Sequence, residues 1–163
     1  MEMLQILMLE NILLFVHLVG MVVLFGTAAT IGLFMFWTHV TADPSMMAHV
    51  TSVAVRADAF LTAPAMALQL LSGIALARLA GVPLIGSWVT VALGIFAFVV
   101  VHWLPMVFIQ VHLRDMARVA RDTGASLDRS YRILFRIWVI LGCGGFAGLL
   151  VLSWVMVAKP DIF

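Results

Sequence analysis

The fold is decided by the stretch Ile12–Trp37, ILLFVHLVGMVVLFGTAATIGLFMFW, which contains no Asp, Glu, Lys or Arg. A helix needs roughly 20 apolar residues to cross the hydrocarbon core of a bilayer. Three further apolar stretches lie at about residues 59–79, 88–111 and 137–157. Because lipid offers the backbone no water to bond with, each stretch is predicted to be a helix. The sequence therefore predicts an all-α, integral membrane four-helix bundle, with residues 1–163 forming a single transmembrane domain.

The composition supports a membrane protein. Hydrophobic residues make up 64% of the chain, whereas soluble domains contain about 45–50%. Nine basic and eight acidic residues leave a formal net charge of +1. This balance disfavours a soluble enzyme, a nucleic-acid-binding protein and a disordered chain. The lipid bilayer is the expected partner. The single cysteine, Cys143, excludes an intramolecular disulfide and a cysteine-rich metal cage.

The basic residues predict how the chain is oriented. Seven of the nine lie in the two connecting segments, residues 38–58 and 112–136: Arg56, Arg114, Arg118, Arg121, Arg129, Arg132 and Arg136. Arg78 and Lys159 fall on the opposite side. Because short cytoplasmic loops are enriched in Lys and Arg, both segments are predicted to be cytoplasmic. Both termini are then predicted to be extracytoplasmic.

Finer local features can also be predicted. The third helix is expected to continue past Val111 as far as a turn at Thr123–Ser126, which a short helix would follow. His39, His49 and His112 are expected to be solvated in the connecting segments.

Trp37 and Trp138 should lie at the inner membrane surface, Trp88 and Trp154 at the outer surface, and Trp103 deeper. Gly144 and Gly148 form a GxxxG pattern, which predicts close helix packing inside the bundle.

Polar side chains inside a span are functional candidates, because they are costly to bury in lipid. His17 lies in the outer part of the first span, and Met21 follows one turn later on the same face. A neutral imidazole at His17 suits an axial haem ligand, a copper ligand or a proton relay. The alternative is a histidine that bonds a neighbouring helix. His102, one turn before Pro105 in the third span, is a further ligand candidate or a local hydrogen-bonding residue.

A second polar group is predicted near the inner surface. Six residues are assigned to this cluster or ligand site: Arg56, Asp58, Gln69, Gln110, Arg114 and Arg136. Of these, Gln69 is expected deeper, near the middle of the second span. Asp58 is expected to pair with a cation, either Arg136 or Arg114, because an unpaired charge at this depth is expensive. The cluster then acts as a structural ion pair, or as a site for a headgroup or quinone.

The order of these signals resembles an uncharacterised bacterial family of predicted four-span integral membrane proteins. The residues that carry the resemblance run along the chain: His17-Leu18-Val19-Gly20, Gly26, Asp58, Thr62, Pro64, Gln69, Gly73, Trp103-Leu104-Pro105, Gln110, Arg114 and Ala158-Lys159-Pro160. That family is similar, at a distance, to the CopD-type copper-resistance proteins and the HemJ-type protoporphyrinogen oxidases. The resemblance implies a multi-pass protein of the bacterial cytoplasmic (inner) membrane.

The resemblance also implies a cofactor. In the HemJ type a histidine early in the first span ligates b-haem, and His17 is in the matching place. That type also uses a lysine early in its third span, but residues 86–93 here contain none, so no second ligand is carried over. We therefore expect haem b at His17, with His102 and Met21 as further cofactor-binding candidates, in electron transfer or a quinone-coupled oxidase-like reaction.

Two other functions remain open on the sequence alone. A small transporter or copper-permeation protein would use His17, Met21, His102 and Met106 as transient copper sites. A non-catalytic scaffold or assembly subunit would use its glycine faces and basic segments to bind a membrane partner subunit or a second copy of itself. Stoichiometric haem, copper or a colourless complex would distinguish the three.

Overall fold

The computed structural model describes residues 2–41 and 43–160, and these residues are helical apart from short connections. The elements in chain order are α1 (Glu2–Thr41), α2 (Pro44–Ala57), the π-helix η1 (Asp58–Thr62), α3 (Ala63–Leu79), α4 (Trp88–Thr123) and α5 (Arg129–Ala158). Because α2, η1 and α3 follow one another without a break, they form one long helical rod. The described residues thus contain four helical stretches long and apolar enough to cross a membrane, which confirms the all-α four-span prediction.

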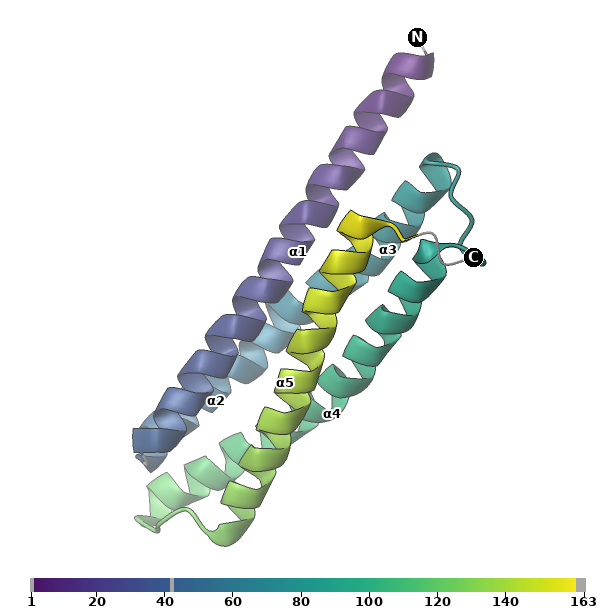
Figure 1. Cartoon of the computed structure of the whole chain (residues 1–163). Coiled ribbons are helices and arrows are strands. Elements are labelled where there is room, and N and C mark those ends of the chain that lie inside the picture. The colour runs from purple at the N-terminus through teal and green to yellow at the C-terminus, as the bar shows by residue number, and fades with distance from the viewer. Residues whose placement is uncertain (1, 42, 161–163) are drawn as a thin grey trace.

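The helices form two packed pairs, α1 with α3 and α4 with α5, and α2 joins the pairs by packing against α4 (Figure 1). The start of α1 and the end of α5 lie at the same end of the bundle. The α1–α2 and α4–α5 connections lie at the other end, where most of the arginines are located. We call this the basic end. Its placement in the cytoplasm remains a prediction from the charge distribution.

The helices extend beyond the predicted spans. As expected, the third helix continues well past Val111, and the turn that ends it contains Gly124, whose φ of 67° is in the left-handed region that favours glycine. The separate short helix predicted after this turn is wrong. Asp128 instead caps α5 directly, because its carboxylate accepts a hydrogen bond from the backbone N–H of Tyr131 at 2.9 Å.

The segment before the second span is also helical rather than a loop. Asp43 caps α2 by accepting a hydrogen bond from the N–H of Ser45 at 2.9 Å, and Pro44 occupies the first helical turn. Both are standard signals of a helix start. The buried face of α2 contains Met47, Ala48, Thr51 and Ala54. This short amphipathic helix was missed because it is too polar to resemble a membrane span.

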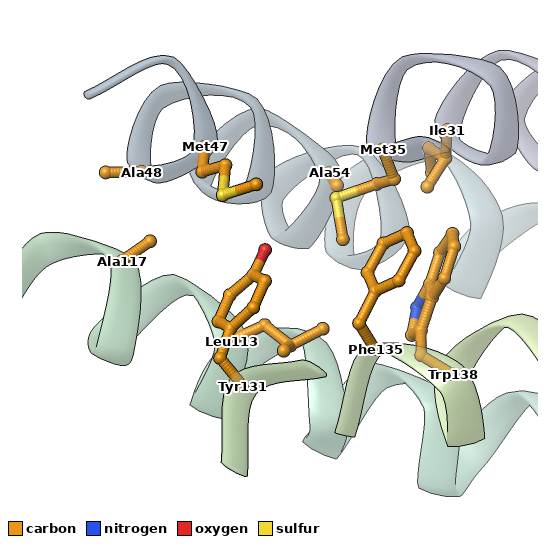
Figure 2. Close-up of a cluster of buried hydrophobic side chains, with 10 residues drawn as sticks. All are labelled: Ile31, Met35, Met47, Ala48, Ala54, Leu113, Ala117, Tyr131, Phe135 and Trp138. Atoms are coloured by element: carbon orange, nitrogen blue, oxygen red, sulfur yellow. The ribbon is translucent and has the colours of Figure 1, made fainter. Parts of the chain in front are cut away.

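A core cluster fills the basic end of the bundle (Figure 2). It draws side chains from α1, α2, α4 and α5: Ile31, Met35, Met47, Ala48, Ala54, Leu113, Ala117, Tyr131, Phe135 and Trp138. We call it the basic-end core. Trp138 is only 4% exposed, so its ring packs inside the bundle, and its depth at the inner membrane surface stays a prediction. Its ring stacks near that of Phe135, with ring centroids 5.7 Å apart.

His39 also belongs to this region and is not a solvated loop residue. Because α1 continues to Thr41, His39 is held on the helix and faces α5. Its ring stacks on that of Phe135 with centroids 3.8 Å apart and an interplanar angle of 8°. His49 and His112 are exposed, as expected.

Candidate functional site

His17 lies in the half of α1 away from the basic end and is buried against α3, with 7% of its surface exposed. Its Nδ1 is 2.8 Å from the Oγ of Ser72. Gly73 makes room for the ring, because a Cβ atom at Gly73 would lie only 3.2 Å from the Cε1 of His17. Two neighbouring residues of α3 therefore fix the position of this imidazole.

The Ser72 contact favours one tautomer of His17. The hydroxyl of Ser72 donates its single hydrogen to the carbonyl oxygen of Leu68, one turn earlier in α3. The Oγ of Ser72 must then accept the hydrogen bond from Nδ1–H of His17. In this tautomer Nε2 carries no proton, and the hydrogen bonds of His17 among the described residues involve Nδ1 alone. This is the arrangement usual for a metal-binding histidine, whose second nitrogen donates to a neighbouring acceptor.

A small cavity lies between helices of both pairs and begins at Met21, one turn of α1 after His17, which does not border it. It measures about 30 Å³ and is bordered by Met21, Leu24, Phe25, Gln69, Phe96, Leu149, Leu152, Ser153 and Met156. The Oε1 of Gln69 is buried and has no hydrogen-bond partner, while the hydroxyl of Ser153 is 4.0 Å from the sulfur of Met21. The cavity is large enough for a water molecule, but far below the ~300 Å³ of small-ligand pockets.

His102 and His17 pack against different helices. Its Nδ1 is 3.0 Å from the carbonyl oxygen of Phe98, and its ring packs on α5, where a Cβ at Gly144 would lie 2.8 Å from Cδ2. The two candidate histidines are therefore held by separate helices, α3 and α5. Among the described residues, no three His, Cys, Asp or Glu side chains are placed to hold a metal ion.

A second buried polar group surrounds Asp58, the first residue of η1. The indole Nε1–H of Trp103 on α4 donates to the Oδ1 of Asp58 at 3.2 Å. The side chains of Thr62 and Gln110 also approach the carboxyl group. Thr62 in turn links this group to α1 by a 3.3 Å hydrogen bond to the hydroxyl of Thr27. We call Asp58, Thr62, Trp103 and Gln110 the inner polar site.

The predicted ion pair of Asp58 with Arg136 or Arg114 is wrong. Arg114 pairs instead with its neighbour Asp115, at 2.8 Å, and the exposed Arg56 donates to the carbonyl oxygen of Ser52. Arg136 is exposed on α5. Among the described residues, no cation lies within 4.0 Å of the Asp58 carboxyl. Arg56 and Arg136 are exposed near the basic end, where a long charged side chain can reach water or headgroups at little cost.

The predicted polar cluster thus divides into separate parts. Gln69 belongs with His17 in the half away from the basic end, whereas Asp58 and Gln110 lie together nearer the basic end. Trp103 was not predicted as part of the site. Its one signal in the sequence is its depth, because a tryptophan buried in a span needs a partner for its N–H.

A family model described as "Predicted integral membrane protein (DUF2269)" matches residues 11–160, nearly the whole chain. The chain belongs to this family. No curated protein and no solved structure matches the chain. The DUF2269 match includes both His17 and the inner polar site, and its description confirms an integral membrane protein. The likeness to the CopD and HemJ types remains an expectation from the sequence.

Proposed function

We propose that this DUF2269 protein binds b-type haem through the Nε2 of His17, in the bacterial cytoplasmic membrane. The observation that carries the proposal is the hydrogen bond from His17 to Ser72. With Nδ1 as the donor, this contact leaves Nε2 free to bind iron. A buried histidine within a span is also costly. The Ser72 bond, which is the predicted alternative of a bond to a neighbouring helix, satisfies Nδ1, and a bound iron would satisfy Nε2.

The residues present fit one axial position. His17 supplies the nitrogen ligand, Ser72 orients it, and Gly73 makes room for its ring. Met21 and His102 are directed to α5 and are not joined to His17 by any described contact. The neighbouring cavity of about 30 Å³ is too small for a porphyrin, so a haem on His17 would lie outside it.

The proposed role is electron transfer, or an oxidase-like reaction coupled to quinone. A bound haem would supply the one-electron chemistry, while the chain supplies the ligand and the apolar surroundings that tune the potential. Ser72 would do more than position the ring. As the acceptor for Nδ1–H, it raises the electron density on the imidazole and so strengthens Nε2 as a ligand.

His17→Ala is the decisive variant for this function. We expect detergent-purified wild-type protein to contain b-type haem near one per chain, measured by oxidised and dithionite-reduced spectra and by the pyridine haemochrome. His17→Ala should lose this spectrum because the iron loses its ligand. The matched control is His112→Ala, which removes an exposed histidine of α4 and should keep the haem. A colourless wild-type protein from haem-sufficient cells, or a haem that survives His17→Ala, would contradict the proposal.

One observation favours a second candidate, a soft metal ion such as copper. Met21 and Met156 border the same cavity, and thioether sulfur is a ligand type that Cu(I) prefers. If the purified protein is colourless, metal analysis distinguishes a copper-binding protein from a scaffold subunit. Stoichiometric copper that is lost in Met21→Leu would support it, whereas a colourless, metal-free protein in a stable complex would indicate a scaffold subunit.

A further inference from the structure

The inner polar site contains a carboxyl group that has no cation to balance it. Asp58 is 2% exposed, and only its Oδ1 has a hydrogen-bond partner, the indole of Trp103. Its Oδ2 is buried and unpartnered. Gln110, which is fully buried beside it, has neither its Oε1 nor its Nε2 hydrogen-bonded. Unpaired buried polar atoms are rare in folded proteins and call for an explanation.

The surroundings of Asp58 are electrically neutral on every side. Trp103 and Gln110 face it from α4, and Thr62 faces it from η1 and bonds Thr27 of α1. No charged side chain is among the groups that approach the carboxyl. An ionised carboxylate buried in this way would lose its hydration without gaining a counter-charge, which costs far more than burying the neutral acid.

We propose that Asp58 is a proton-binding site within the membrane, with its carboxyl held as a neutral acid whose Oδ2–H donates to the Oε1 of Gln110. This hydrogen bond would satisfy two of the unpartnered atoms with a single proton. Oδ1, as the carbonyl oxygen, keeps the hydrogen bond from Trp103. Binding forms the Oδ2–H bond from a carboxylate and a proton from water, and release reverses it.

The backbone supports a functional role for this position. Asp58 opens the π-helix η1, and short π-helices occur often at functional sites. Ionisable groups inside membrane spans commonly mark proton or ion paths. The proposal does not rest on haem, because no described contact joins the inner polar site to His17.

Infrared spectroscopy of the full chain, in a detergent without ester or carboxyl groups, tests the proposal. At pH 7 we expect a carbonyl stretching band of a protonated carboxyl group, which should disappear only when the pH is made alkaline. The band should be absent from Asp58→Asn and retained in Asp115→Asn, the matched change at an exposed carboxylate of α4. A wild-type spectrum without this band at pH 7 would overturn the proposal, and that measurement needs no variant to fold.

Two further measurements sharpen the test. Gln110→Leu removes the proposed acceptor, so the Asp58 band should shift to higher frequency, and an unmoved band would overturn the hydrogen bond to Gln110. The oxygens of Asp58, Thr62 and Gln110 are also suitable ligands for a hard cation. If adding Na⁺ at fixed pH removes the band and adding K⁺ does not, the site binds sodium, and the proposal of a proton site is overturned.

Discussion

Replacing Phe135 with alanine is expected to lower the free energy of unfolding by about 3–5 kcal/mol. Phe135 is at the centre of the basic-end core, where side chains from four helices meet (Figure 2). Its ring stacks on His39 of α1, with centroids 3.8 Å apart, and lies near Trp138. The truncation would leave a cavity that these stiff aromatic neighbours cannot close. The loss in free energy of unfolding should therefore be among the largest seen for substitutions in protein cores.

The measurement is the reversible unfolding of wild type and variant in mixed micelles, followed by circular dichroism. Phe36→Ala is the matched control, because Phe36 lies one residue from Met35 on α1 but is 57% exposed. We expect this control to change the free energy of unfolding much less, since its ring contacts lipid or detergent in both states. Equal losses in the two variants would show that the basic-end core does not hold the helices together.

Replacing Gly148 with leucine is expected to cost about 1–3 kcal/mol by overpacking. Gly148 is buried where α5 packs on α4. A Cβ there would lie 2.9 Å from Cγ2 of Val99 and 3.2 Å from Cδ1 of Phe98. The buried Val99 is stiff at χ1 and cannot turn away. The overlap with a leucine at position 148 can therefore be removed only if α4 and α5 move apart. The GxxxG prediction for close packing inside the bundle is thereby confirmed at Gly148.

Gly94→Leu provides the control for this prediction. Gly94 is on α4, and a Cβ there would meet nothing within 4 Å. Leucine has a higher helix propensity than glycine, by roughly 0.5–1 kcal/mol, so Gly94→Leu should raise the stability slightly. The two substitutions are chemically identical, and thermal unfolding of both proteins compares them directly. A stable Gly148→Leu protein would contradict the close approach of α4 and α5.

The four spans were predictable because lipid imposes a simple requirement on the chain. A backbone without water must bond to itself, so a long apolar stretch specifies a helix whatever its neighbours are. The same argument failed for residues 44–57. This segment lies beside the spans and its helix depends on packing against α4, while its starting signals, Asp43 and Pro44, are short and local.

The candidate site was predictable only in part. His17 and Asp58 stood out because a titratable group in a span is unusual. Their partners depend on how the helices are rotated against one another, which hydropathy does not determine. Ser72 was therefore not singled out. The charge of Asp58 suggests an ion pair with Arg136 or Arg114, whereas the fold leaves Arg136 exposed and brings the indole of Trp103 to the carboxyl.

In the proposed function, α1 and α3 hold His17 with Nδ1 protonated and Nε2 free to bind a metal ion. Nitrogen NMR of histidine-labelled, haem-free protein measures this tautomer directly, with the His17 signals assigned by their loss in His17→Ala. We expect a protonated Nδ1 and an unprotonated Nε2 at pH 7, and mixed tautomers in Ser72→Ala, which lacks the acceptor. A proton on Nε2 in the wild-type protein, or a signal unchanged by Ser72→Ala, would contradict the account.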